Sequence, residues 1–291
     1  MSGKKRLSFD TSAVNDLASD PDGEPLLAGI LSGYFTRLTC PSVEEPLATE
    51  NLARRTALVH TLRKLLTNGE CVQTHDFITA GLIRNYERCG TSRWASADIH
   101  FPACEDMIAR GEILDDLGPN VREFELQAEK EFERLFLDAR PDFEPLFAKG
   151  AKRPSSTREL LDLLLNGDGE AFWTTSALLY RRFVGYSPSK EKLHAFALDC
   201  PPLLAAMLAT LHAHYEWAIR EKPVSTRKRV NRMDVYGAIY LPYCDVYVTS
   251  DAEQMGCLME VASLAGLSTD VIHYHEFRAK LDPFSSLRRS A

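Results

Sequence analysis

Two short segments at opposite ends of the chain each read as a buried strand that runs into an aspartate. The first is Leu7 to Asp10 and the second is Cys244 to Asp251. In open parallel sheets, ligands bind in the crevice outside the carboxyl ends of the strands. Two acids so far apart in sequence become useful to each other only when the fold brings them together, and a parallel sheet can do this. The pattern therefore favours an α/β fold with Asp10 and Asp251 at one edge of the sheet.

Other periodic patterns near the two ends of the chain support this fold class. β-Branched and aromatic residues predict strands over Tyr34–Cys40, Cys71–Thr74, Asp245–Thr249 and Asp270–Tyr274. Apolar residues at helical spacing, with turn and capping signals at their ends, predict helices over residues 24–34, 50–66, 234–243 and 252–264. Strands that alternate with helices are typical of a parallel sheet covered by helices.

The middle of the chain has a different character. It contains long helical patterns, the clearest over residues 123–139, 157–165 and 202–220, and almost no strand signal. We therefore expect residues 1–75 and 221–291 to form one α/β domain, with residues 76–220 as a helical insertion or subdomain. The sequence leaves open whether this segment is a lid over a substrate, the interface of a homo-oligomer or a surface for a protein partner.

Composition and charge restrict the class of protein. Hydrophobic residues make up 45% and charged residues 26% of the chain, as in soluble globular proteins. The net charge of −7 means that a nucleic-acid binder would need a local basic patch. No apolar run is long enough to span a bilayer, and no apolar stretch follows the basic N-terminus as in a signal peptide. Seven cysteines without a C-x-x-C pair argue against a zinc site or a disulfide framework, so we expect a cytoplasmic protein.

Four acids fall at the ends of predicted strands or at the start of a predicted helix. Asp10 follows the first strand and Asp251 follows the strand that begins near Asp245. Asp234 opens the late helix, and Glu45 follows the second strand, with Glu44 as the alternative. These positions place the acids at the edge of the sheet where the carboxyl ends of parallel strands meet.

The segments Phe9–Asn15 and Tyr240–Asp251 together resemble the PIN-domain family of metal-dependent nucleases, which includes the toxin ribonucleases of bacterial toxin–antitoxin pairs. The family has an Asp after the first strand, a Glu after the second, an Asp that opens a late helix and an Asp after the next strand. The resemblance covers only the two ends of the chain. It implies a three-layer α/β/α fold with a central parallel sheet, RNA as substrate and an antitoxin or another protein as a partner of the helical region. It also implies that Mg²⁺ or Mn²⁺ is held by Asp10, Glu45, Asp234 and Asp251, with Asp245 as an auxiliary acid.

Such an acidic cluster suits the hydrolysis of a phosphodiester. Water must add to a centre that is already anionic, and a divalent cation lowers the pKa of that water and offsets charge on the phosphate oxygens. Mg²⁺ and Mn²⁺ prefer oxygen ligands and keep several waters, so a few carboxylates are enough. Several carboxylates in one pocket repel each other without a cation. A cluster of this kind is therefore costly to build and indicates a function.

Each of these acids also has an ordinary structural explanation. Asp10 and Asp251 stand where a strand meets a helix and could serve as helix N-caps. Ser42 and Glu45 have the spacing of a capping box, in which the two side chains satisfy the first N–H groups of a helix. Asp234 could be an acid favoured in a first turn by the helix dipole. Capping does not exclude metal binding, and the sequence leaves both roles open.

A basic run leads directly into Asp234. It makes Arg227, Lys228, Arg229 and Arg232 candidates for contacts with a phosphate backbone, and a solvated loop is the alternative. Small polar residues beside the aspartates are candidates to support the metal or its waters, and local turn hydrogen bonds are the alternative; these residues are Thr11, Asn15 and Thr249.

The sequence thus favours a Mg²⁺- or Mn²⁺-dependent ribonuclease, and a catalytically inactive PIN-like module for binding or scaffolding is the alternative. A phosphatase of the haloacid-dehalogenase type also begins with a strand and an Asp. That chemistry needs a second Asp two residues after the first, and this chain has Ser12 there. No phosphate-binding or dinucleotide-binding glycine motif occurs.

Overall fold

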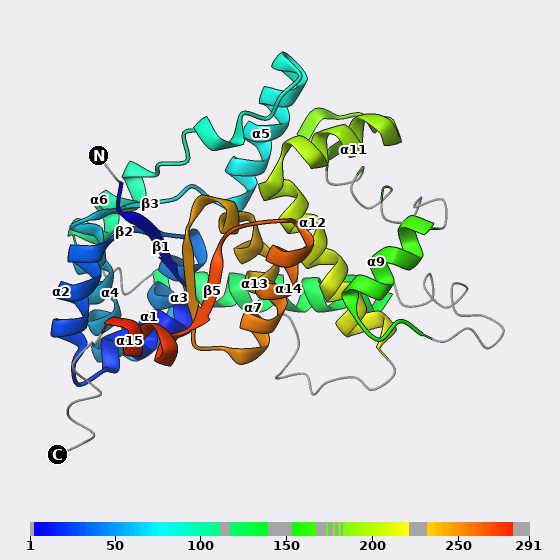
Figure 1. The fold of residues 1–291 in the computed structure, drawn as a ribbon. Helices are drawn as coiled ribbons and strands as arrows, with labels where there is room; N and C mark the ends of the chain where they lie inside the picture. The colour runs from blue at the N-terminus through cyan, green and yellow to red at the C-terminus, as the bar shows by residue number, and fades with distance from the viewer. Residues whose placement is uncertain are drawn as a thin grey trace.

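The computed structural model describes residues 3–110, 117–138, 153–166, 173, 177, 180–181, 183–220 and 232–281. Five strands form one all-parallel sheet in the order β3-β2-β1-β4-β5, with helices on both faces (Figure 1). The strands are β1 (Lys5–Phe9), β2 (Tyr34–Leu38), β3 (Gly69–Cys71), β4 (Val246–Thr249) and β5 (Asp270–His273). This arrangement confirms the predicted α/β class with a central parallel sheet between helical layers.

The two central strands hold the ends of the chain together. In the register of β1 with β4, Leu7 lies beside Val246 and Phe9 beside Val248. Side chains alternate between the two faces of a strand, so these residues point to the same face. All four are buried, and they form part of one hydrophobic core with helices on that side of the sheet. The sheet therefore brings the segment after Phe9 next to the segment after Thr249.

Helices from the N-terminal part of the chain, together with the C-terminal helix, cover this first face. They bury leucine, isoleucine and valine side chains against the strands, and Figure 1 shows α2 and α4 on this side. Their bounds are α1 (Thr11–Ser19), α2 (Gly23–Gly33), α3 (Cys40–Ala48), α4 (Leu52–Leu66), α6 (Pro102–Arg110) and α15 (Tyr274–Leu281).

The second face is covered largely by α12 (Pro201–His214) and α14 (Ala252–Leu264). Ala205 and Ala209 of α12 lie in the same core as Tyr247 of β4. Helix α12 falls inside the segment predicted as an insertion, yet it packs directly on the α/β core. Helix α12 is thus part of the sheet's second layer, and the division of the chain into two domains stays a prediction.

The other side of α12 contributes to a separate helical core. This core joins α12 to the helices of the middle segment and to Ile239, Tyr240 and Tyr243. The remaining elements are α5 (His75–Cys89), η1 (Trp94–Ser96), α7 (Leu117–Asp138), α9 (Thr157–Asn166), α11 (Lys190–Asp199), the π-helix η3 (Tyr215–Ile219), α13 (Arg232–Gly237) and the 3-10 helix η5 (Ala238–Tyr243). Within the described ranges no single helix is long and apolar enough to span a membrane, and only the bent pair Lys190–Asp199 with Pro201–Ile219 could, by length and composition alone.

Gly69 allows β3 to approach β2 closely. A methyl group at this position would overlap the hydroxyl and carbonyl oxygens of Thr36 in β2. The backbone oxygen cannot move without breaking the strand pairing, so we expect Gly69→Ala to lower the free energy of unfolding by about 1–3 kcal/mol. Chemical denaturation measures this loss. Gly81→Ala in α5 is the control, because nothing lies near its added methyl group and alanine favours a helix. Equal stability of the Gly69→Ala and wild-type proteins would contradict this account.

Candidate functional site

The strand order reverses between β1 and β4. The chain moves outward from β1 to β3 and then returns to place β4 on the other side of β1. Loops that leave the two central strands run in opposite directions at such a point and leave a crevice at the carboxyl ends of the strands. Asp10 follows β1 directly, and Ser250 and Asp251 follow β4. The topology thus puts the two aspartates of the opening sequence pattern at the crevice.

A pocket of about 190 Å³ opens at this point. All four predicted acids line it, although they come from four separate segments of the chain: Asp10, Glu45, Asp234 and Asp251. The other described residues on its wall are Thr11, Ser12, Pro41, Met233, Tyr247 and Gln254. No lysine, arginine or histidine is among these described lining residues. The pocket is therefore an acidic hollow without a basic side chain on its described wall.

Asp10 combines a structural role with a place on the pocket wall. As the N-cap of α1 it accepts a hydrogen bond from the backbone N–H of Ala13 at 2.8 Å. The hydroxyls of Ser12 and Thr249 lie 2.7 Å and 2.9 Å from its Oδ2. Asp10 is only 7% exposed. Burial raises the pKa of its carboxyl above the ordinary value, and these hydrogen bonds offset part of that rise.

Asp251 is likewise both a cap and a lining residue. Its Oδ1 accepts from the backbone N–H groups of Glu253 at 2.8 Å and Gln254 at 3.0 Å, at the start of α14. The side chain is exposed. A carboxylate offers about four lone pairs on its two oxygens, so capping through Oδ1 is compatible with a further ligand.

Glu45 is not part of a capping box, which corrects the sequence-based alternative. The N-cap of α3 is Thr39, and the Ser42 hydroxyl lies inside the helix, where it donates to the Thr39 carbonyl at 2.7 Å. Glu45 follows in the next turn and lines the pocket. Its neighbour Glu44 is not on the described lining and accepts instead from the Cys40 thiol at 3.0 Å. The structure therefore places Glu45, rather than Glu44, at the acidic hollow.

Asp234 lies in the first turn of α13 and is 6% exposed. Its Oδ1 accepts from the side-chain amide of Gln254 at 2.7 Å. Gln254 and Tyr247 are lining residues that sequence reasoning missed. Gln254 comes three residues after Asp251 on the same helix turn, and Tyr247 shares a strand face with Thr249, so spacing alone could have found them. Burial raises the pKa of Tyr247, and nearby carboxylates, including Asp10, raise it further.

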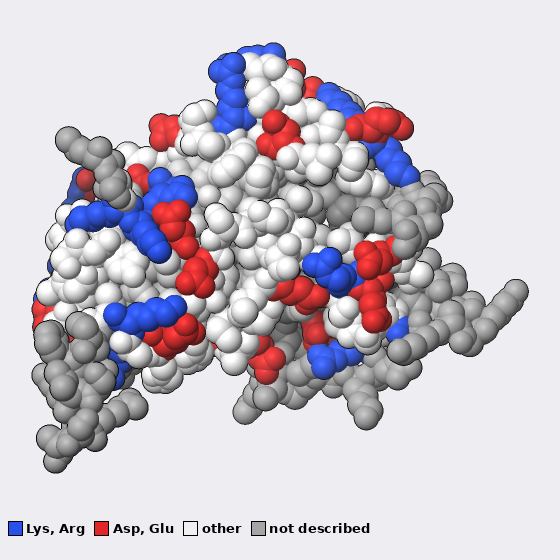
Figure 2. Space-filling view, viewed as in Figure 1, with Lys and Arg blue, Asp and Glu red and all other residues white. Residues whose placement is uncertain are grey.

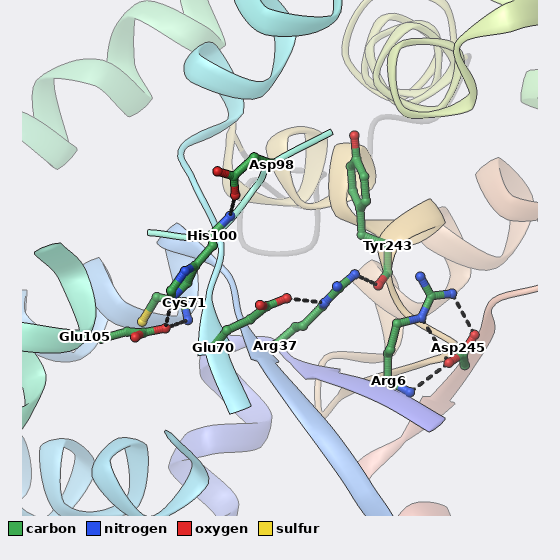
Figure 3. Close-up of polar contacts among 9 residues, drawn as sticks. All are labelled: Arg6, Arg37, Glu70, Cys71, Asp98, His100, Glu105, Tyr243 and Asp245. Carbon is green, nitrogen blue, oxygen red and sulfur yellow. Dashed lines mark hydrogen bonds and ion pairs between the residues drawn. The ribbon is translucent and has the colours of Figure 1, made fainter. Parts of the chain in front are cut away.

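Asp245 lies away from these acids, so its predicted role as an auxiliary ligand is corrected. It stands at the amino end of β4, whereas the pocket is at the carboxyl end. Its two carboxylate oxygens accept from the guanidinium of Arg6 at 2.8 Å and 3.1 Å, and Oδ2 also accepts from the Arg6 backbone N–H at 2.7 Å (Figure 3). These bonds from Arg6 lower the pKa of Asp245. This acid forms an ion pair that joins β1 to the start of β4.

The structure buries the side chain of Arg232, which the sequence predicts to bind the substrate. It is 8% exposed, and its guanidinium lies over the ring of Tyr236 with 5.2 Å to the centroid. The contact of Arg232 with a phosphate backbone stays a prediction. The other predicted basic contacts, Arg227, Lys228 and Arg229, lie outside the described residues. Among the described residues on the face drawn in Figure 2, basic and acidic side chains are interspersed.

The three predicted supporting residues have different surroundings. Thr249 is buried and bonded to Asp10, as described above. Thr11 is on the pocket wall, with its hydroxyl 3.2 Å from the Pro41 carbonyl. Asn15 is not on the described lining, and its side-chain oxygen accepts from Arg54 at 3.0 Å. Only Thr11 and Thr249 are thus placed to support the acidic hollow.

The donor set of the pocket suits a hard divalent cation, because its acids offer carboxylate oxygens and its described wall carries no competing positive charge. With the side chains as placed, no group of three or more His, Cys, Asp and Glu residues in the described parts of the chain is arranged to hold a metal ion. Binding would therefore require the acids to turn toward a common point. Glu45 has three rotatable side-chain bonds, and the exposed Asp251 has room to move.

Comparison of the chain with protein-family models, with curated proteins and with solved structures finds no significant match. A function for the protein is therefore inferred from the pocket and its residues.

Proposed function

We propose that this chain is a Mg²⁺- or Mn²⁺-dependent ribonuclease with a PIN-like fold. The observation that carries the proposal is the convergence of Asp10, Glu45, Asp234 and Asp251 on one pocket at the switch point of the sheet. Like charges held in one partly buried site destabilise each other unless a cation or protons offset them. Helix capping explains two of the acids individually, but it does not explain why four segments deliver acids to the same hollow.

In this proposal the four acids would hold the cation. A divalent cation bound there supplies a water of lowered pKa and offsets charge on the phosphate oxygens. Ser12 and Thr249 fix the orientation of Asp10 through its Oδ2. Helices α1 and α14 begin at the pocket, so their N-terminal partial charges favour an anionic group near the cation. RNA as the substrate follows from the family resemblance, and residues 227–229 would supply basic contacts to it.

The alternative is a PIN-like module that binds or scaffolds without catalysis. Two observations favour it: Asp10 and Asp251 already serve as helix caps, and the described acids are not arranged to hold an ion as placed. The two hypotheses differ in one measurable property, which is the binding of a divalent cation in the pocket. A nuclease needs a specific divalent-cation site in this pocket, whereas an inactive module does not.

Calorimetric titration with Mn²⁺, together with cleavage assays on single-stranded and structured RNAs in Mn²⁺ and in EDTA, tests the proposal. We expect the wild type to bind Mn²⁺ and to cleave RNA only with the metal. Asparagine is as good an N-cap as aspartate, so Asp251→Asn should keep the start of α14 intact. The substitution removes an exposed carboxylate that would bind the cation, and we therefore expect the affinity for Mn²⁺ to fall by about tenfold or more. Asp245→Asn, in the ion pair with Arg6, is the control that keeps wild-type binding.

The results of the titration and the cleavage assays distinguish the nuclease from the inactive binding module. A wild type that leaves every RNA intact in Mn²⁺ removes the catalytic proposal. If it also shows no Mn²⁺ binding that depends on Asp251, the binding module remains. Equal Mn²⁺ binding by wild type and Asp251→Asn would show that the cation is held elsewhere.

A further inference from the structure

Gln254 connects three of the four acids. It lies in the first turn of α14 and is 7% exposed. Its backbone N–H donates to Asp251, and its side-chain Nε2 donates to Asp234 at 2.7 Å. Its Oε1 lies 2.6 Å from the hydroxyl of Thr249, which in turn lies 2.9 Å from Asp10. One buried side chain thus joins acids that come from different segments of the chain.

The chemistry of these contacts requires an amide. An ionised carboxylate only accepts hydrogen bonds, so the atom of Gln254 that faces Asp234 must be a donor. This fixes the amide with Nε2 toward Asp234 and leaves Oε1 as the acceptor toward Thr249. A glutamate here would set an acceptor against Asp234, and an aliphatic residue would leave both partners without their bond.

The orientation of Gln254 also affects Asp10. A hydroxyl carries a single proton, but Thr249 faces two acceptors, Oε1 of Gln254 at 2.6 Å and Oδ2 of Asp10 at 2.9 Å. The Thr249 hydroxyl is thus held between Gln254 and Asp10, so the orientation of Gln254 also restricts the position of this donor beside Asp10.

We propose that Gln254 is a positioning residue for the metal site, an inference that rests on the proposed function. Its amide holds Asp234 in a fixed orientation and keeps the Thr249 hydroxyl beside Asp10. Both acids line the pocket, so Gln254 fixes the relative position of two of its carboxylates. Gln254 acts through Asp234 and Thr249, so it tunes the affinity for the metal rather than the chemical step.

Two substitutions test this role. Gln254→Met keeps the length of the side chain and removes both bonds, whereas Gln254→Asn keeps the amide but is too short to reach Asp234 and Thr249 together. We expect each to weaken Mn²⁺ binding by about 10–100-fold, in line with the loss of residues that orient metal ligands. The Mn²⁺ concentration for half-maximal cleavage should rise by the same factor. Cleavage at saturating Mn²⁺ should change much less.

The control is Met259→Leu, an exposed position on the same helix, which should keep wild-type affinity for Mn²⁺. Thermal unfolding in EDTA shows whether each variant is folded. If wild type binds Mn²⁺ and cleaves RNA while folded Gln254→Met and Gln254→Asn proteins do so with wild-type affinity, the role of Gln254 is overturned and the proposed function stands. The role of Gln254 is also overturned, and the proposed function again stands, if the variants lose thermal stability but their folded fraction binds Mn²⁺ with wild-type affinity. A wild type that neither binds Mn²⁺ nor cleaves RNA overturns both proposals.

Discussion

Replacing Asp10 by Asn should abolish RNA cleavage and, at the same time, stabilise the metal-free protein. Asparagine is as good an N-cap as aspartate, so the bond from the Ala13 N–H is kept. The variant loses a carboxylate that would bind the cation, and we expect cleavage to fall by at least about 100-fold, because even residues behind the ligands are worth about 10–100-fold. The gain in stability follows from the burial of Asp10, which makes its charged form unfavourable in the folded protein.

The pH dependence of stability shows when the Asn variant should be more stable than the wild type. Burial raises the pKa of Asp10 in the folded state above its unfolded value. The stability that this group contributes is therefore fully present below the unfolded pKa and is lost as the pH rises through the folded pKa. At acidic pH the protonated Asp10 resembles asparagine, and the two proteins should unfold at similar temperatures. As the pH rises toward neutrality, the Asn variant should become the more stable of the two.

Thermal unfolding in EDTA at about pH 3 and about pH 7, on either side of the ordinary titration of aspartate, measures this difference. Added Mn²⁺ should reverse the order at neutral pH, because a ligand stabilises only the folded protein that binds it. Asp245→Asn is the control, since Arg6 lowers the pKa of that acid and its loss should destabilise the protein at neutral pH. An Asp10→Asn protein that cleaves RNA normally would mean that Asp10 is only a helix cap.

Much of the sheet was predictable because its strands carry strong local signals. Val246 to Thr249 is buried along its whole length and reads as a continuous run of β-branched and aromatic residues. The third strand was predicted over Cys71–Thr74 but lies at Gly69–Cys71, because it is short and is defined by its pairing with β2 rather than by its own residues. Helix α3 begins at Cys40, before the helix start that a capping box of Ser42 and Glu45 would give. Pro41 reads as a stop, although a proline is well tolerated in a first turn.

The place of the helical middle depended on packing that the sequence shows only indirectly. Ala205, Ala209 and Ala213 repeat at intervals of four on α12 and form one narrow stripe of small side chains. In the structure this stripe belongs to the core with β4 and α14. A helix with small residues on one side can lie close to a sheet, and this pattern could have indicated that α12 belongs to the α/β core.

The positions of the candidate acids could be predicted from local sequence patterns. The other polar residues that contact these acids depend on tertiary packing, which the local patterns do not show. Asp10 and Asp251 could be located from strand ends, and the parallel sheet then brings them together. Arg232 was assigned from a run of positive charge, yet its own packing against Tyr236 removes it from the surface. Gln254 reaches Asp234 only because α13 and α14 lie side by side. The sequence does not encode that contact in any short motif.

Glu44 and Glu45 offer the sharpest test of which acids serve the pocket. They are adjacent on α3, and both accept the same substitution by glutamine with almost no change in shape. Glu45 lines the pocket, whereas Glu44 accepts a hydrogen bond from Cys40. We expect Glu45→Gln to lower RNA cleavage in Mn²⁺ by at least about 100-fold, because it removes a charged ligand, and Glu44→Gln to stay near the wild-type rate.

Mn²⁺ titration of the two variants separates metal binding from a general disturbance of α3. Glu45→Gln should bind Mn²⁺ more weakly than wild type and unfold no earlier in EDTA, because one negative charge fewer reduces repulsion in the pocket. Glu44→Gln should keep the wild-type affinity, since its carboxylate points to the thiol of Cys40. If Glu44→Gln alone lost cleavage, the acid from this segment would act from the other side of α3. The hollow formed by Asp10, Asp234 and Asp251 would then lack its fourth ligand and could not be the site of hydrolysis as proposed.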